Sequence, residues 1–123
     1  MANATSIVIP SGSTQGKGIK IVATSTPGTT IHTTGVSSTT VDRLYIFGVN
    51  SDTVDRNVTI EFGGTTSPDN VIQTFPLPFK QGLVLLVDGL PLLGNSSVGL
   101  TVAAFASATN VVVIYAYILR VVP

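Results

Sequence analysis

Hydrophobic residues either alternate with polar ones or form short apolar runs, and no segment keeps a helical period. Runs of β-branched and aromatic residues are separated by clusters of Gly, Pro, Ser, Thr, Asn and Asp, a pattern typical of strands joined by turns. Eight or nine such strands predict an all-β fold, a sandwich or a barrel. We predict strands at residues 19–24, 29–34, 41–50, 56–62, 82–87 and 110–121, with further candidates at 6–9, 71–75 and 99–106.

The alternation is clearest in residues 56–62. Val58, Ile60 and Phe62 alternate with polar residues, which predicts a strand with one buried and one exposed face. A short, turn-rich linker at 51–55 joins it to the strand at 41–50. So short a connection predicts that these two strands pair as an antiparallel hairpin.

The last predicted strand differs, because residues 111–119 are apolar at every position. Tyr115 and Tyr117 share one of its faces. We expect this strand to be buried on both faces, either at the centre of the core or at a subunit interface, and the strand near 83–87 to behave alike. Residues 99–106 have the alanine content of a helix, but their alternation favours a strand.

The length of 123 residues fits one domain with a single core. We assign residues 19–123 to this β-sandwich domain. Residues 1–18 are rich in Ser, Thr, Gly and Asn around Ile7, Val8 and Ile9. We interpret them as a partly ordered N-terminal arm whose apolar triplet could reach a neighbouring subunit.

Charged residues make up only 10% of the chain, and six positive and six negative side chains cancel. An average globular protein has about 25% charged residues. Such a chain lacks the cluster of Lys and Arg that binds nucleic acid, so we expect no nucleic-acid partner. It also lacks the net charge that keeps free monomers apart, which suits a protein packed against other subunits.

Candidate catalytic or metal-binding residues are sparse. His32 is the single histidine and there is no cysteine, so we expect no zinc site and a solvent-facing His32. No serine lies in a Gly-x-Ser-x-Gly elbow, and the glycine-rich residues 12–18 depart from a phosphate-binding loop in spacing. Asp52 and Asp55 lie in a loop without calcium-site spacing, so a turn role is the better interpretation. We therefore predict a protein that is not an enzyme and has no metal or cofactor.

Three segments resemble a known group of proteins. Residues 41–53, 56–64 and 82–87 are similar to small virion proteins of tailed bacteriophages, in particular to head decoration (cement) proteins of some phages, including cyanophages. The resemblance covers about residues 41–121. It implies a jelly-roll-like antiparallel β-sandwich that associates, often as a trimer, on the outer surface of an icosahedral capsid. There it would lock neighbouring major capsid proteins together, without catalytic residues.

These observations together predict a structural virion protein whose partners are the major capsid protein and further copies of itself. We expect Ile7, Val8, Ile9, Tyr115 and Tyr117 to contribute to its interfaces. The start of the chain has no signal-peptide pattern, and the longest apolar run is too short to span a bilayer as a helix. We therefore expect assembly in a host cytoplasm and no membrane partner. The alternative is a head-fibre or tail-associated module that recognises host-surface glycans through exposed aromatic residues.

Overall fold

The computed structural model describes residues 4–123, and every regular element in that range is a strand. All nine predicted strands, including the alanine-rich one, are present. No helix in the described residues could cross a membrane. The strands are β1 (Ala4–Val8), β2 (Ile19–Lys20), β3 (Thr29–Thr33), β4 (Val41–Asn50), β5 (Arg56–Phe62), β6 (Val71–Leu77), β7 (Val84–Leu92), β8 (Thr101–Ala106) and β9 (Val112–Val122).

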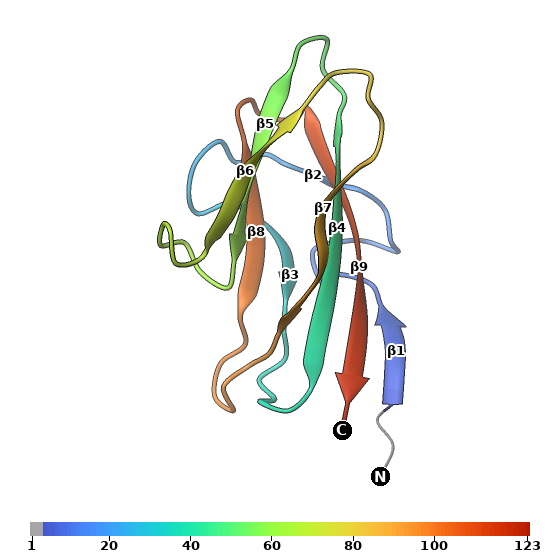
Figure 1. The fold of residues 1–123 in the computed structure, drawn as a ribbon, viewed down its shortest axis with the longest axis vertical. Coiled ribbons are helices and arrows are strands. Elements are labelled where there is room, and N and C mark those ends of the chain that lie inside the picture. Colours follow the sequence, from blue (N-terminus) through green and yellow to red (C-terminus); the bar gives the residue numbers. More distant parts are fainter. Residues whose placement is uncertain (1–3) are drawn as a thin grey trace.

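The strands form two antiparallel sheets packed face to face, so the predicted β-sandwich is confirmed (Figure 1). The first sheet has the order β1-β9-β4-β7, and β2 pairs with β9 beyond the end of β1. The second sheet has the order β3-β8-β5-β6. If β1 and β2 are counted as one interrupted strand, each sheet has four positions, and long connections pass between the sheets. This is the double Greek-key order of a jelly roll.

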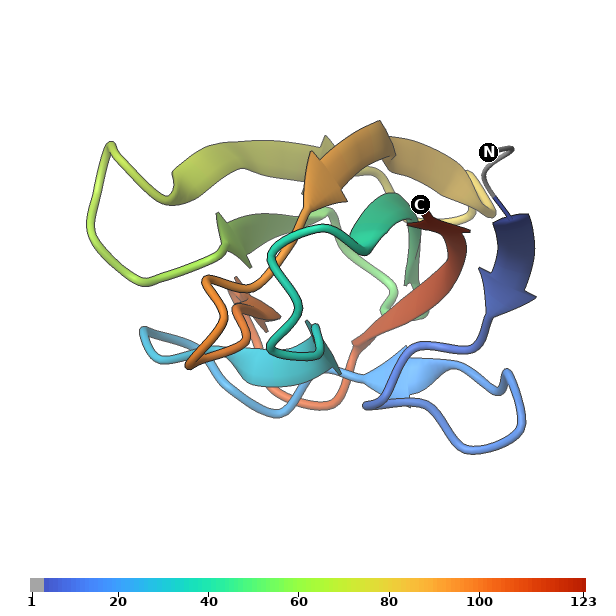
Figure 2. The same ribbon diagram turned by 90° about the horizontal axis from the view of Figure 1, so that it is seen from below.

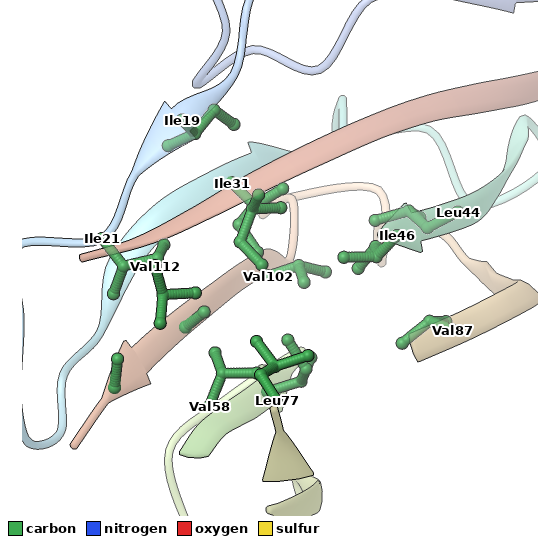
Figure 3. Packing of buried hydrophobic residues seen from close by; sticks show 14 of the residues in the cluster. Ile19, Ile21, Ile31, Leu44, Ile46, Val58, Leu77, Val87, Val102 and Val112 are labelled. Carbon is green, nitrogen blue, oxygen red and sulfur yellow. The ribbon is translucent and has the colours of Figure 1, made fainter. Parts of the chain in front are cut away.

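The core lies between the two sheets and is built from aliphatic side chains (Figure 3). The first sheet contributes Leu44 and Ile46 from β4, and the second contributes Val58 from β5 and Val102 from β8, each with no exposed surface. Full burial of such a side chain stabilises the fold by about 1.5–3 kcal/mol. The two sheets are therefore held together mainly by apolar packing.

The predicted hairpin of β4 and β5 is wrong, because the two strands belong to different sheets. Both edges of β4 are occupied by β9 and β7, and both edges of β5 by β8 and β6. The linker instead carries the chain from one sheet to the other around Asn50. The side-chain amide of Asn50 donates hydrogen bonds to the carbonyl oxygens of Val54 and Leu77, both at 2.8 Å, and its oxygen accepts from the Asp52 amide at 2.8 Å.

The segment predicted as an arm contains an edge strand of the first sheet. β1 pairs with β9 from Ala4 opposite Val122 to Val8 opposite Ile118. Seen from below, β1 lies beside β9 at the margin of the molecule (Figure 2). Residues 1–3 of the predicted arm lie outside the described residues. A reach of the arm to a neighbouring subunit stays a prediction.

Candidate functional site

The outer face of the first sheet is apolar and aromatic, although it points away from the core. Even-numbered residues of β4 are buried, and odd-numbered residues of β4 point outward. The register sets Tyr45 opposite Tyr117 and Phe47 opposite Tyr115, and directly opposed residues share a face. We call this surface the aromatic face. Its members are Ile7, Tyr45, Phe47, Leu85, Tyr115 and Tyr117.

Of the two places expected to bury both faces of β9 and of the strand near 83–87, the centre of the core is therefore wrong, and burial at a subunit interface stays a prediction. Tyr115 is 42% exposed, Tyr117 is 37% exposed and Leu85 is 47% exposed. The side chains of both tyrosines therefore lie on the outer face of the sheet and not in the core between the sheets. An apolar run shows that neither face of a strand is polar, but it does not show that both faces are covered.

The aromatic rings have a defined arrangement. Tyr45 and Tyr117 stack with ring centroids 4.7 Å apart and planes 6° apart, and Phe47 lies 6.3 Å from Tyr117. Two glycines leave room for the rings: a Cβ at Gly89 would lie 2.8 Å from the Tyr45 ring, and one at Gly18 would lie 2.9 Å from the Tyr115 ring. Backbone and side chains together thus fix the rings on this surface.

The five predicted interface residues do not all share this surface. Ile7 pairs with Leu119 of β9 and is 73% exposed on the aromatic face. Val8 points to the other side of β1 and packs against the core. Ile9 follows the strand and is also exposed. The structure therefore brings Ile7 together with the two tyrosines of β9, and it places Val8 elsewhere.

His32 is buried, with 2% of its surface exposed, so its predicted exposure to solvent is wrong. The register of β3 against β8 shifts between Thr30 and His32. This irregularity breaks the strict alternation of the strand, so that Ile31 and His32 are both buried although they are adjacent in sequence. Sequence alternation alone gave no signal for it.

His32 takes part in a buried network that joins the two sheets. Its Nδ1 accepts a hydrogen bond from the Ser11 amide at 3.1 Å, so its Nε2 carries the proton and donates to Oδ2 of Asp42 at 2.8 Å. Arg120 of β9 donates to both oxygens of Asp42, from Nε at 2.8 Å and from Nη2 at 3.0 Å. The carboxylate is therefore paired from both sides.

This pairing decides the ionisation of Asp42. Burial raises the pKa of its carboxyl, but the hydrogen bonds from Arg120 and His32 and the charge of Arg120 outweigh burial and hold the pKa below its ordinary value. Asp42 thus stays ionised at neutral pH. Because His32 comes from β3 and Arg120 from β9, the charge ties the second sheet to the first.

Ser11, His32 and Asp42 are near one another, but they do not form a catalytic triad. The group of Ser11 that meets the imidazole is its backbone N–H, while its hydroxyl accepts a hydrogen bond from the Thr33 amide at 2.8 Å. Both ring nitrogens of His32 are therefore occupied, and neither can take a proton from the serine hydroxyl. The arrangement is suited to holding the fold together.

Glu61 is the second buried carboxylate, with 1% of its surface exposed. It lies on the outer side of β5, the side predicted to face solvent, so the prediction of a half-exposed strand is wrong. The loop before β3 folds over it: Gly28 donates its amide to Oε1 at 2.7 Å, and the Thr26 hydroxyl donates to Oε2. A Cβ at Gly28 would lie 2.6 Å from backbone atoms of Ala104, so glycine permits this close cover.

Two clefts open beside the two buried carboxylates. A cleft of about 310 Å³ is formed by Glu61, the loop before β3 and the glycine-rich segments around Gly63 and Gly99. A second cleft, of about 300 Å³, is lined by Asp42, Arg120 and residues of the loop between β3 and β4. In the first cleft the carboxylate has only neutral partners, and in the second it is already paired.

The loop aspartates serve turns. Asp52 accepts a hydrogen bond from the Thr53 amide at 2.7 Å and pairs with Arg56, and Asp55 accepts from the Phe79 amide at 3.2 Å. Within residues 4–123 no group of three or more His, Cys, Asp or Glu side chains is close enough to hold a metal ion.

Comparisons with protein-family models, curated proteins and solved structures found no significant match for this chain.

Proposed function

We propose that this protein is a structural virion subunit that decorates an icosahedral phage head and stabilises it by bridging major capsid proteins. The observation that carries the proposal is the aromatic face, an uncovered apolar surface on a molecule with few charges. Monomeric proteins rarely expose a large apolar patch unless a partner covers it. The proposal that the assembly is a phage head comes from the resemblance to phage decoration proteins of residues 41–53, 56–64 and 82–87.

The size of the aromatic face suits contact with a second copy of the chain. With strands spaced about 4.8 Å apart and about 3.4 Å per residue, β1, β2, β9, β4 and β7 give the first sheet an outer face of roughly 600 Å². Stable interfaces bury about 800 Å² on each partner. The outer face of this sheet therefore supplies most of the area of a subunit contact.

The charges on this side of the sheet do not oppose self-association. Arg43, Asp88 and Lys20 lie on or beside the aromatic face, and the chain as a whole is neutral. Sister subunits would meet through the aromatic face, in an oligomer such as a trimer, and that oligomer would touch several capsid proteins at once. Multivalency then converts weak single contacts into firm attachment.

Co-sedimentation with heads that lack the protein tests this function. Saturable binding at a fixed ratio to the major capsid protein, with a gain in the heat resistance of the heads, is expected. The oligomer would be measured in parallel by light scattering. Tyr117→Lys should yield monomers and lose head binding, because a charge would be buried in the apolar contact. Gln73→Lys adds the same charge on β6, an exposed position in the other sheet, and should change neither result.

Failure of the wild-type protein to bind heads, whether as monomer or oligomer, would overturn the decoration role. Equal behaviour of the Tyr117→Lys and Gln73→Lys variants would overturn the role of the aromatic face.

The second candidate is a glycan-binding module, which the exposure of Tyr115 and Tyr117 favours. Jelly rolls include lectins as well as capsid proteins. However, stacking of Tyr45 on Tyr117 occupies one ring face of each, which leaves fewer ring faces for a sugar to stack on. Titration with glycan arrays separates the candidates, because specific glycan binding by a chain that ignores phage heads would favour the module.

A further inference from the structure

Glu61 is a buried carboxyl group, and no cationic side chain among residues 4–123 lies within ion-pair distance of it. Its two hydrogen-bond partners, Thr26 and Gly28, are neutral. Among residues 4–123 the ion pairs within 4 Å join Asp42 to Arg120 and Asp52 to Arg56, and none involves Glu61. Burial of an ionised carboxylate is costly without a charged partner. A bound cation would therefore stabilise the ionised form of Glu61.

A cleft beside Glu61 offers such a cation a place to bind. Glu61 forms part of the wall of the 310 Å³ cleft, a volume at the lower end of the range for small-molecule sites. Across the second sheet, Thr30, Ala103 and Glu61 occupy adjacent register positions on the outer face, and the small side chain of Ala103 leaves space between the other two. Thr101 lines the same cleft.

The chemistry of the walls limits the kind of cation. A calcium ion needs six to eight oxygen ligands, and a guanidinium prefers both oxygens of a carboxylate in a bidentate pair. Here a single carboxylate is available, and each of its oxygens already accepts a hydrogen bond from the loop. A primary ammonium needs only one carboxylate oxygen and can direct its other donors to hydroxyls such as those of Thr30 and Thr101.

The same cleft offers apolar contacts for a short carbon chain. Pro27, Leu100 and Ala103 line it together with several glycines. We propose that this cleft binds a primary alkylammonium group, with its charge at Glu61 and its methylenes along the apolar wall. A lysine side chain of a partner protein and a free small amine share this chemistry. The proposal does not rest on the decoration role.

Amide NMR titration of the whole chain tests the site. Butylammonium chloride should shift the amides of Gly28, Gly63, Gly99 and Thr101 saturably, in the millimolar range. Butanol, of similar shape but uncharged, should not. Because this comparison uses the wild-type protein, it does not depend on any variant folding.

A variant of Glu61 then tests whether its carboxylate is the group that binds the ammonium. Glu61→Gln can keep both loop hydrogen bonds, because its amide oxygen accepts from Gly28 and its amide nitrogen donates to Thr26. It should weaken butylammonium binding by about tenfold or more, as expected for a lost charged hydrogen bond. Asp69→Asn removes a negative charge from an exposed loop position and should bind like the wild type.

Two further titrations complete the test. Binding of Nα-acetyl-lysine methylamide at the same amides would identify a protein lysine as a fitting source, while binding of butylammonium alone would identify a free amine. Equal shifts with butanol, unchanged binding by Glu61→Gln, or saturation by calcium chloride without any response to the amine would each overturn the proposal.

Discussion

Asp42 and Glu61 are both almost fully buried, yet the fold surrounds them in different ways. Asp42 lies in the first sheet and is paired with Arg120 and with His32. Glu61 lies on the outer side of the second sheet, under a loop that gives it only neutral donors. The carboxylate of Asp42 is thus part of a network between the sheets that includes the charged Arg120, and the carboxyl group of Glu61 anchors a loop through neutral donors.

The comparison shows that burial alone does not define the role of a carboxylate. Where one of the partners is charged, as Arg120 is, removal of the negative charge leaves that partner without its counter-ion. Where the partners are neutral, the same change leaves the hydrogen bonds in place. The two sites therefore predict a large loss of stability at Asp42 and a small change at Glu61 when the carboxylate is replaced by an amide.

The largest effect is expected for Asp42→Asn. The new amide group must face either Arg120 or His32, both of which are donors, so one of them loses its acceptor. Because Arg120 is 32% exposed, the loss is smaller than for a fully buried pair, about 2–4 kcal/mol. Urea unfolding followed by circular dichroism would measure the loss. Asp69→Asn, at an exposed position, should stay within about 0.5 kcal/mol of the wild type. A comparable loss in both variants would refute the special role of Asp42.

A smaller effect is expected at Glu61, and it should depend on the replacement. Glu61→Ala leaves the Gly28 amide and the Thr26 hydroxyl without their acceptor, at a cost of about 1–3 kcal/mol. Glu61→Gln keeps both bonds and removes the buried charge, so its free energy of unfolding should lie within about 1 kcal/mol of the wild type. The same urea experiment compares them. A Gln variant as unstable as the Ala variant would show that the charge itself holds the loop.

The smallest effect is a pH dependence that belongs to Asp42. Burial raises the pKa of Asp42, but Arg120 and His32 lower it by a larger amount. The pKa of Asp42 in the folded protein therefore lies below the ordinary value of 3.8. As the pH falls, the unfolded chain takes up this proton first. The stabilisation is therefore complete above pH 3.8 and is lost as the pH falls through the folded pKa, by at most about 1.4 kcal/mol per pH unit.

Urea unfolding of the wild type and of Asp42→Asn would be compared between about pH 6 and about pH 2.5. The difference in their free energies of unfolding isolates the titration of Asp42, because the other carboxylates are common to both proteins. The difference in stability should be constant at the upper end and should shrink at the acidic end. A difference that stays constant throughout would contradict the lowered pKa.

The strands themselves could be predicted from the sequence, because alternation and turn residues are local signals. Which strands pair could not. The linker between β4 and β5 is as short as that of a hairpin, but the side chain of Asn50 holds it in a bend that crosses between sheets. Pairing depends on the neighbours that occupy each edge, and these come from distant parts of the chain.

The candidate sites were harder to predict than the strands. The period of a strand placed Tyr115 and Tyr117 on one face of β9, but nothing in the apolar run says whether that face is covered. His32 was misplaced because a local register shift buries it beside Ile31. Glu61 was misplaced because a loop more than thirty residues away covers it, since its bond to Gly28 spans 33 positions.

The pairing of β1 with β9 has a consequence for engineering. Ala4 lies directly opposite Val122, so the beginning and the end of the described chain leave the sandwich side by side. A peptide or fluorescent domain fused to either end would project from the same corner of the molecule. A short linker between the two ends would permit a circular permutant, opened at one of the loops between sheets, that keeps every strand neighbour of the jelly roll.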